Sequence, residues 1–371
     1  MRHAISRCLF LSLSISLSLP LGSLTAVLAS GCGGDTTTTG GTSTTGGGAM
    51  CPEDLIKAPN SEFCAAGAKA VDCTLVTPAD TNQVCGVALS QPSADLKRSA
   101  TVKEFAGAGA PKVDCFAPAG YPAKADPASS KTTQMSGTVK IFSHGCESKL
   151  VKIEVFEVGA EGALGAAAGT ALTTASDCMA NGVASDNGDC GTRYECNYIY
   201  SGVPTEKELV IRTSGVNWAD FYDYNIFISN AAVVNGEWKH DLRCLAAEDY
   251  NAIAQAAIGG PITAGNGALA GEIHDCGDVR LQNARVDIDQ PKKILTYFTS
   301  NEATPLPDLA ATGTSTLGIY AALDVAPGPV TVAAVGNVGG KVTTLGYYSA
   351  RVFANAVTIV TLRGVQPFQV P

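Results

Sequence analysis

The 371-residue sequence lacks the short motifs by which many enzyme families are identified. It contains no H-E-x-x-H zinc motif, no G-x-S-x-G nucleophile turn and no complete phosphate-binding loop. No two cysteines are spaced as C-x-x-C, which argues against zinc-ribbon and thioredoxin-type sites. We therefore expect a protein that is not an enzyme, with no catalytic residue, no metal and no cofactor.

Charged residues are also scarce, at 16 % of the chain, and acidic residues outnumber basic ones to give a formal net charge of −9. An acidic surface repels phosphate backbones, so we expect no nucleic-acid partner. Glycine, in contrast, is abundant, with 40 residues. Few charges and many glycines are more typical of an extracellular all-β protein than of a helical enzyme.

The first feature that is present is an apolar leader. Arg2 and Arg7 precede an apolar stretch over 9–28, as in secretory signal peptides. The stretch ends in Leu28-Ala29-Ser30-Gly31-Cys32, which resembles the lipobox of bacterial lipoproteins, although alanine stands where leucine is usual. The resemblance implies that Cys32 carries diacylglycerol and palmitate, becomes the mature N-terminus, and anchors the chain in a lipid bilayer.

The residue after this cysteine bears on the destination of the protein. Gly33, rather than aspartate, follows Cys32, which in the lipoprotein family usually directs a protein to the outer membrane. Two alternatives stay open. Cleavage after Ala29 would give a secreted soluble protein, and a retained membrane helix is disfavoured by the serines that dilute the apolar stretch.

Changes in composition divide the chain into five segments. The Gly/Thr-rich stretch after Cys32 is typical of a flexible tether, and prolines over 118–127 indicate a boundary. The expected segments are 1–31 (lipoprotein signal peptide), 32–50 (lipidated cysteine and flexible Gly/Thr linker), 51–130 (cysteine-rich disulfide module), 131–262 (first β-sandwich with a C-terminal linking helix) and 263–371 (second β-sandwich).

Cysteine is the second feature that is present, with 13 residues. In an oxidising compartment these cysteines are expected to form disulfides. Once Cys8 in the leader and the lipidated Cys32 are set aside, an odd number remains, so at least one cysteine lies outside any disulfide within the chain. Five cysteines fall in 51–115, which predicts a small loop-rich module whose pairing the sequence does not reveal.

Beyond residue 132 the sequence repeats itself. The repeated segments recur in the same order, and 151–156 and 284–288 alternate apolar and polar residues, as half-buried strands do. They predict two copies of one all-β unit. The matching segments are 136–141 with 270–273, 151–156 with 284–288, 198–204 with 320–327, and 209–211 with 330–332.

The second copy resembles the carboxypeptidase regulatory-like (transthyretin-like) domain over residues 268–364. The likeness rests on Gly271-Glu272-Ile273, on Leu317-Gly318-Ile319-Tyr320 and on the turn and strand over 325–332. It implies a seven-stranded antiparallel sandwich and no particular activity, because such domains serve as non-catalytic modules. The predicted fold is therefore mainly β, with two tandem antiparallel Greek-key sandwiches after the small cysteine-rich module.

One helix is expected between the two sandwiches. Asp241 can cap its start, and Leu242, Leu245 and Ile253 then fall on one face. Gly259 follows the last periodic residue and is expected to end the helix.

A candidate ligand site comes from the aromatic residues of the first sandwich. Trp218, Tyr222 and Tyr224 lie in a stretch that reads as a loop, where exposed rings could stack on the flat face of a sugar. The competing interpretation places these rings in the core. They are our candidate ligand-binding residues.

Metal sites are weighed and not adopted. His144 and His274 each stand two residues before a cysteine at equivalent places in the repeats, so an imidazole and a thiolate could share a metal. A turn residue beside a disulfide-bonded cysteine explains each histidine without metal. The acidic loop around Asp186 lacks the ligand spacing of an EF-hand, and a polar loop explains it equally well.

These observations favour a non-catalytic, membrane-anchored cell-surface lipoprotein that acts as a structural or adhesive array of β domains. The alternative is a carbohydrate-binding surface protein that uses the exposed aromatics of the first sandwich. Beyond the lipid bilayer, the expected partner is a surface glycan or another protein.

Overall fold

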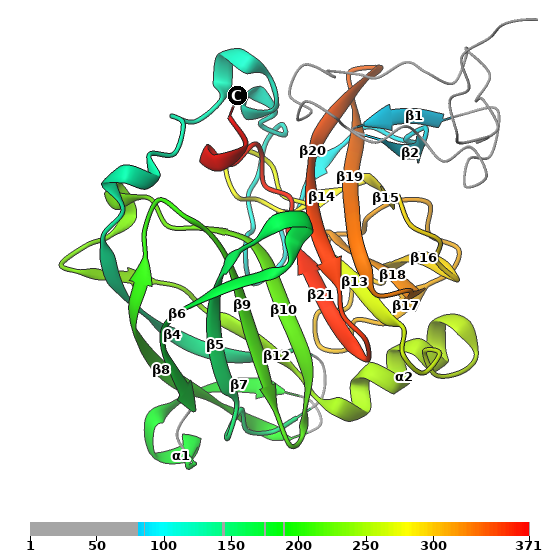
Figure 1. The fold of residues 1–371 in the computed structure, drawn as a ribbon. Helices are drawn as coiled ribbons and strands as arrows, with labels where there is room; N and C mark the ends of the chain where they lie inside the picture. Colours follow the sequence, from blue (N-terminus) through cyan, green and yellow to red (C-terminus); the bar gives the residue numbers. More distant parts are fainter. Residues whose placement is uncertain (1–80, 85, 143–144, 174–175, 188–189, 371) are drawn as a thin grey trace, which may run out of the picture. The chain divides into compact units, whose positions relative to one another are not determined.

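The protein is mainly β in its described part, which confirms the predicted fold class (Figure 1). Cys32, the predicted signal peptide, the Gly/Thr-rich stretch and residues 51–80 of the predicted cysteine-rich module lie outside the described residues. No described helix is long and apolar enough to cross a membrane. The computed structural model describes residues 81–84, 86–142, 145–173, 176–187 and 190–370.

Ahead of the repeats, the described residues from Thr81 onward form only short elements. Strands β1 and β2 make an antiparallel hairpin, and β3 pairs with β14 of the second repeat. Three turns of 3₁₀ helix then follow, two of them with proline in the first turn. The bounds are β1 (Thr81–Val84), β2 (Val87–Ser90), β3 (Lys97–Arg98), η4 (Asp114–Phe116), η5 (Pro118–Gly120) and η6 (Pro127–Ser129).

The first repeat contains two β layers. In one layer β4 pairs with β8 and, in parallel, with β12; in the other β9 lies between β5 and β10. Its elements are β4 (Thr132–Phe142), β5 (Lys152–Val158), η7 (Ala160–Gly162), β6 (Leu164–Thr173), α1 (Cys178–Asn181), β7 (Gly182–Asn187), β8 (Gly191–Pro204), β9 (Glu208–Gly215), β10 (Trp218–Phe227), η8 (Asn230–Ala232), β11 (Glu237–Lys239) and β12 (Leu242–Leu245).

The second repeat pairs its strands in the same way. Strand β13 pairs with β18 and, in parallel, with β21, while β19 lies between β15 and β20. The elements from the interrepeat helix onward are α2 (Ala247–Ile258), β13 (Gly267–Glu272), β14 (Leu281–Gln282), β15 (Arg285–Ile288), β16 (Ile294–Phe298), β17 (Pro307–Asp308), β18 (Ile319–Val325), β19 (Gly328–Val338), β20 (Lys341–Val352), β21 (Ala356–Val360) and η9 (Pro367–Gln369).

The repeat predicted from the sequence is therefore present as a repeated strand order. Each matched segment falls in equivalent strands, so that β4, β5, β8 and β9 correspond to β13, β15, β18 and β19. The expectation of purely antiparallel sheets is wrong at β4–β12 and β13–β21, which pair in parallel. A parallel pair needs a long crossover, and in each repeat the intervening strands supply it.

The two repeats share one sheet. Strand β10 pairs in parallel with β21 over five residue pairs, from Asp220–Ala356 to Tyr224–Val360, and Figure 1 shows the two strands side by side. Alone, each strand would leave a row of N–H and C=O groups at the edge of its sheet. The pairing satisfies these groups and creates a nine-stranded sheet with the order β17-β16-β18-β13-β21-β10-β9-β5-β6.

Both faces of the nine-stranded sheet are covered. On one face Ile153 and Ile211 pack against Val139 of the β4–β8 layer. On the opposite face Tyr224 of β10 shares a core with Tyr348 of β20. Consequently β10 is buried on both faces, because each face packs against a different layer.

Helix α2 covers the part of the first face that belongs to the second repeat. It begins at Ala247, later than predicted, because Leu242 and Leu245 lie in β12 and pack with the sheet. Asp241, expected as the cap, instead accepts a hydrogen bond from the backbone N–H of Thr138 at 2.9 Å. The predicted end is confirmed, since Gly259 has a left-handed φ of 71°.

The prediction of disulfides is confirmed for the described cysteines. Three bonds are present, and Cys244 is buried and free, as the odd count requires of at least one cysteine. The bond from Cys115 ties the segment before the first repeat to the second repeat, 161 residues further on. The three bonds are Cys115–Cys276, Cys146–Cys190 and Cys178–Cys196.

Candidate functional site

The three aromatic residues predicted to form a surface platform lie in strand β10 and are buried. Trp218, Tyr222 and Tyr224 have exposed fractions of 8 %, 6 % and 1 %. The Trp218 indole N–H donates to the carbonyl of Lys149 at 3.0 Å, and the Tyr222 ring stacks on Phe353 with centroids 4.0 Å apart. The expectation that these rings lie exposed in a loop is wrong.

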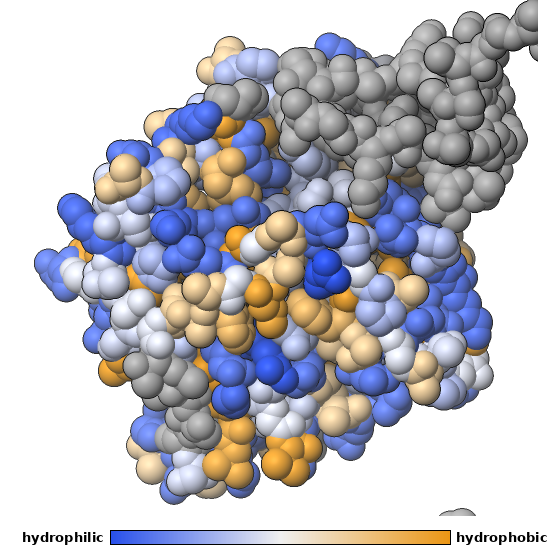
Figure 2. Space-filling view, in the orientation of Figure 1, coloured by the Kyte–Doolittle hydropathy of each residue, from blue (hydrophilic) through white to orange (hydrophobic). Residues whose placement is uncertain are grey.

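The stretch around Trp218 resembles a loop in sequence because strand β10 contains two irregularities. Register shifts between Trp218 and Phe221, and between Asp223 and Ile226, break the alternation that marks a strand in sequence. The large hydrophobic side chains that are exposed among the described residues are not aromatic, and Figure 2 shows apolar residues interspersed with hydrophilic ones on the face in view. None of the three candidate rings is therefore exposed for stacking on a sugar.

The histidine–cysteine pairs do not form a metal site in the described part of the chain. Cys146 and Cys276 are in disulfides, and His144 lies outside the described residues. The His274 ring is buried, with Nδ1 2.7 Å from Asp278 and Nε2 2.9 Å from Glu272. No group of three or more His, Cys, Asp or Glu side chains there is arranged to hold a metal ion.

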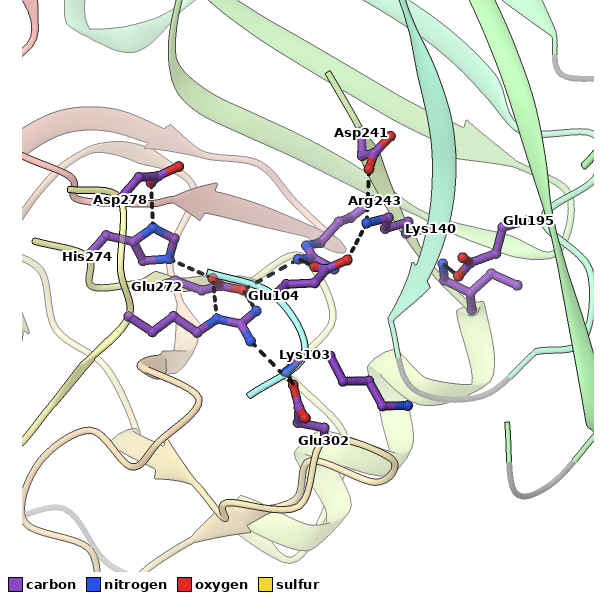
Figure 3. A network of polar contacts seen from close by, with 12 residues as sticks. Lys103, Glu104, Lys140, Glu195, Asp241, Arg243, Glu272, His274, Asp278 and Glu302 are labelled. Atoms are coloured by element: carbon purple, nitrogen blue, oxygen red, sulfur yellow. Dashed lines mark hydrogen bonds and ion pairs between the residues drawn. The ribbon is translucent and has the colours of Figure 1, made fainter. Parts of the chain in front are cut away.

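His274 belongs to a group of charged side chains that we call the ionic cluster (Figure 3). Its centre is Glu272 on β13, which accepts two hydrogen bonds from the Arg280 guanidinium, both at 2.9 Å. Arg243 on β12 lies 3.8 Å from Glu272 and 2.8 Å from Glu104. The members are Glu104, Lys140, Asp241, Arg243, Glu272, His274, Asp278 and Arg280.

The carboxylates at the centre of this cluster stay ionised. Burial acts to raise the pKa of Glu272, but the His274 hydrogen bond and the charge of Arg243 hold that pKa well below its ordinary value. Burial also acts on Glu104, whose pKa is nevertheless lowered, chiefly by Arg243 and Lys140. Because Lys140 and Arg243 come from the first repeat and Glu272 from the second, the cluster joins the repeats electrostatically.

The ionic cluster borders a polar cleft with about 1200 Å³ of empty volume. Both acidic and basic side chains line its walls in similar numbers, so neither sign of charge dominates. Lys103 stands at the rim, where its backbone N–H donates to Glu302 at 2.9 Å. The charged residues that line the cleft are Lys103, Glu104, Lys140, Arg193, Glu195, Arg243, Glu272, Arg280 and Glu302.

A second hollow, which we call the apolar cavity, adjoins the polar cleft and has about 790 Å³ of empty volume. The two hollows share Arg243 and Glu272, which stand where one meets the other. Helix α2 contributes Tyr250 and Ile253 to the cavity. Most of the residues that line the cavity are apolar.

Asp223 is the one charged residue of the apolar cavity that stands outside the ionic cluster. Its carboxylate makes no hydrogen bond or ion pair with the described residues, and it keeps some exposure through the cavity. Burial raises its pKa to about 7, opposed by the charges of Arg363 and Arg243 and assisted by Glu272. Such a group changes charge near neutral pH.

Sequence reasoning missed this site. Asp223 and Glu272 each fall two residues from an apolar inward-facing residue, Phe221 and Ala270, so the strand period places both carboxylates toward the interior. That signal was present in the sequence. Arg243 was assigned to a helix, which hid its position on β12.

Comparisons with known proteins identify no family. No protein-family model and no curated protein matches this chain. Among solved structures, the chain is similar to one in the structure of the Streptococcal ancillary pilin, with 11 % identity and a TM-score of 0.17. The match covers 63 % of this chain and 62 % of that chain, and at so low a TM-score it carries no argument about function.

Proposed function

We propose that this protein is a lipid-anchored protein of the outer membrane with a structural or adhesive role and no catalytic activity. The anchor rests on the sequence around Cys32 and on the Gly/Thr linker that follows it. The linker would hold the β repeats close to the membrane while leaving them free to reorient.

The observation that carries the structural or adhesive role is the parallel pairing of β10 with β21. A fixed arrangement of domains suits a protein that bears load or presents a binding surface built from more than one domain. Domains joined only by a linker move relative to each other by default. In this protein, five residue pairs between β10 and β21 and the ion pairs of the ionic cluster connect the two repeats directly and restrict their relative motion.

The anchor is tested by fractionating a Gram-negative host that expresses the full chain. We expect the wild-type protein in the outer membrane, with an acylated N-terminal cysteine by intact mass. The Cys32→Ala variant should be released or misprocessed, whereas Thr44→Ala in the linker should behave as wild type. Recovery of wild-type protein with an unmodified N-terminus at Ser30 would refute the anchor.

The role is tested on intact cells by chemical cross-linking, followed by identification of the linked partners. A structural or adhesive protein should yield a reproducible protein or glycan partner that is absent from a deletion strain. Removing the protein should also weaken cell adhesion or envelope integrity, with recovery on complementation. Turnover well above background in a panel of hydrolase and oxidoreductase substrates would contradict the non-catalytic role.

A further inference from the structure

The apolar cavity exists because small residues form its floor. Ala268, Ala270 and Ala321 lie on neighbouring strands β13 and β18, on the face of the sheet that helix α2 covers. Leucine or isoleucine at these positions would fill the space under a helix that packs on a sheet, because protein interiors are normally close-packed. The floor of alanines leaves that space open to a ligand.

The walls of the cavity suit an apolar body. Aromatic and aliphatic side chains from helix α2, from a loop and from several strands surround the floor, and the polar groups are few. This is the usual composition of a small-molecule site, in which a few polar groups orient an otherwise apolar ligand. The apolar wall residues include Phe142, Phe221, Leu245, Ile253, Ile262 and Phe298.

The polar end of the cavity has one carboxylate without a partner. Glu272 is engaged by Arg280 and His274, and Arg243 is engaged by Glu104 at 2.8 Å and Glu272 at 3.8 Å. Asp223 lines the same cavity and makes no hydrogen bond or ion pair with the described residues; the charges of Arg363 and Arg243 act on it without such a contact. A group that is ionised and unpaired in apolar surroundings is costly, and a bound cation would remove that cost.

A polar group of helix α2 is also left without a partner. The Tyr250 hydroxyl is buried and makes no hydrogen bond within the described chain, while its ring lines the cavity. Buried polar atoms of native proteins are nearly always hydrogen-bonded, to protein or to water. An unpaired hydroxyl in a cavity wall therefore points to a bound molecule or water that contacts it.

We propose that the apolar cavity binds a small primary amine with an apolar body, whose ammonium group pairs with Asp223. An anionic ligand is disfavoured, because it would face Asp223 and Glu272 while Arg243 is already engaged by two carboxylates. A neutral alcohol of the same length can fill the cavity but forms no ion pair. This activity is additional to the structural or adhesive role and does not depend on the lipid anchor.

The test is isothermal titration calorimetry on the full mature chain carrying Cys32→Ala, which avoids detergent in the cavity. The probes are hexylamine, hexan-1-ol and hexanoate, at pH 8, where most of Asp223 is ionised given its pKa of about 7. We expect saturable binding of one hexylamine per chain. Hexan-1-ol should bind about tenfold more weakly, which corresponds to one partly screened ion pair, and hexanoate should not bind.

Two variants separate the charge from the cavity. Asp223→Asn should weaken hexylamine about tenfold and leave hexan-1-ol unchanged, because only the ion pair is lost. Ala270→Leu fills the floor and should abolish binding of both probes. Asp220→Asn is the matched control on the same strand, where Asp220 pairs with Arg212 at 2.7 Å outside the cavity, and it should bind hexylamine as the parent does.

Three results would overturn the proposal. If hexanoate bound as tightly as hexylamine, Arg243 rather than Asp223 would determine the charge of the head group that the cavity prefers. Unchanged hexylamine affinity in Asp223→Asn would show that the Asp223 carboxylate does not pair with the ammonium group. Absence of saturable binding by every probe, with the circular dichroism of the parent intact, would show that the cavity is not a site for this class of molecule.

Discussion

The free energy of unfolding of Asp223→Asn, minus that of the wild type, should increase progressively as the pH rises from 5 to 8. Asp223 lies among apolar residues of the cavity, and burial raises its pKa from 3.8 to about 7. The folded protein therefore binds a proton that the unfolded chain releases over this range. Wild-type stability contributed by the neutral carboxyl is fully present below the ordinary pKa and is lost as the pH rises through about 7.

The magnitude follows from the shift. About three pKa units correspond to roughly 4 kcal/mol at full burial. Only the part of the shift between pH 5 and the folded pKa of about 7 falls within the measured range, which limits the effect to roughly 2.7 kcal/mol. Asp223 keeps some exposure through the cavity, and solvent there reduces the effect, so we expect about 1–2.5 kcal/mol between pH 5 and pH 8. Asparagine has the same shape and no charge, and any cost of its unpaired amide is independent of pH. The pH dependence of the difference thus isolates the carboxylate.

The assay is urea unfolding of wild type and variant at matched pH values, each fitted for the free energy of unfolding in water. Arg243, Arg363 and Glu272 surround position 223 in both proteins, so the two measurements differ only in the side chain at that position. Asp220→Asn is the control, because it removes a carboxylate from the same strand outside the cavity. A variant-minus-wild-type difference that stays flat from pH 5 to pH 8 would refute the buried position of Asp223.

Three further predictions concern stability. Glu272→Gln removes the carboxylate that Arg280 and His274 share, and leaves Arg280 only the more distant Glu302, at 3.8 Å, so we expect a loss of about 3 kcal/mol by urea unfolding; a loss under about 1 kcal/mol would contradict the role of the ionic cluster. Removing the Cys115–Cys276 disulfide by a double serine substitution should cost about 2–5 kcal/mol by calorimetry, since the bond closes 161 residues, and an unchanged Tm would exclude it. Trp218→Ala should lower the free energy of unfolding by about 3–5 kcal/mol, and near-wild-type stability would place the ring outside the core.

The repeated strand order was predictable because it depends on local pattern. Segments 151–156 and 284–288 alternate apolar and polar residues, and buried residues alternate with less buried ones in β15 and in the first half of β5. The end of α2 was predictable for the same reason, since Gly259 provides the left-handed residue that a helix end favours. Its beginning was not, because Leu242 and Leu245 fit the spacing of a helix and of a strand equally well.

The sheet that joins the repeats could not be read from the sequence. Whether an edge strand faces water or a second strand depends on long-range placement, which the residues of β10 do not encode locally. Trp218 and Tyr224 show the consequence. Their stretch lacked a strand pattern because the register shifts of β10 disrupt alternation and because both faces of the strand are covered.

The same joint explains why the candidate site has residues from both repeats. Asp223 lies on β10 of the first repeat and is paired in register with Ile359 of β21, while the floor of the cavity belongs to β13 and β18. Separate sandwiches would leave Asp223 at a solvated edge, where a carboxylate needs no partner. The pairing that fixes the two repeats relative to each other therefore also carries the carboxylate into apolar surroundings, and a change that opens β10–β21 should abolish both rigidity and amine binding.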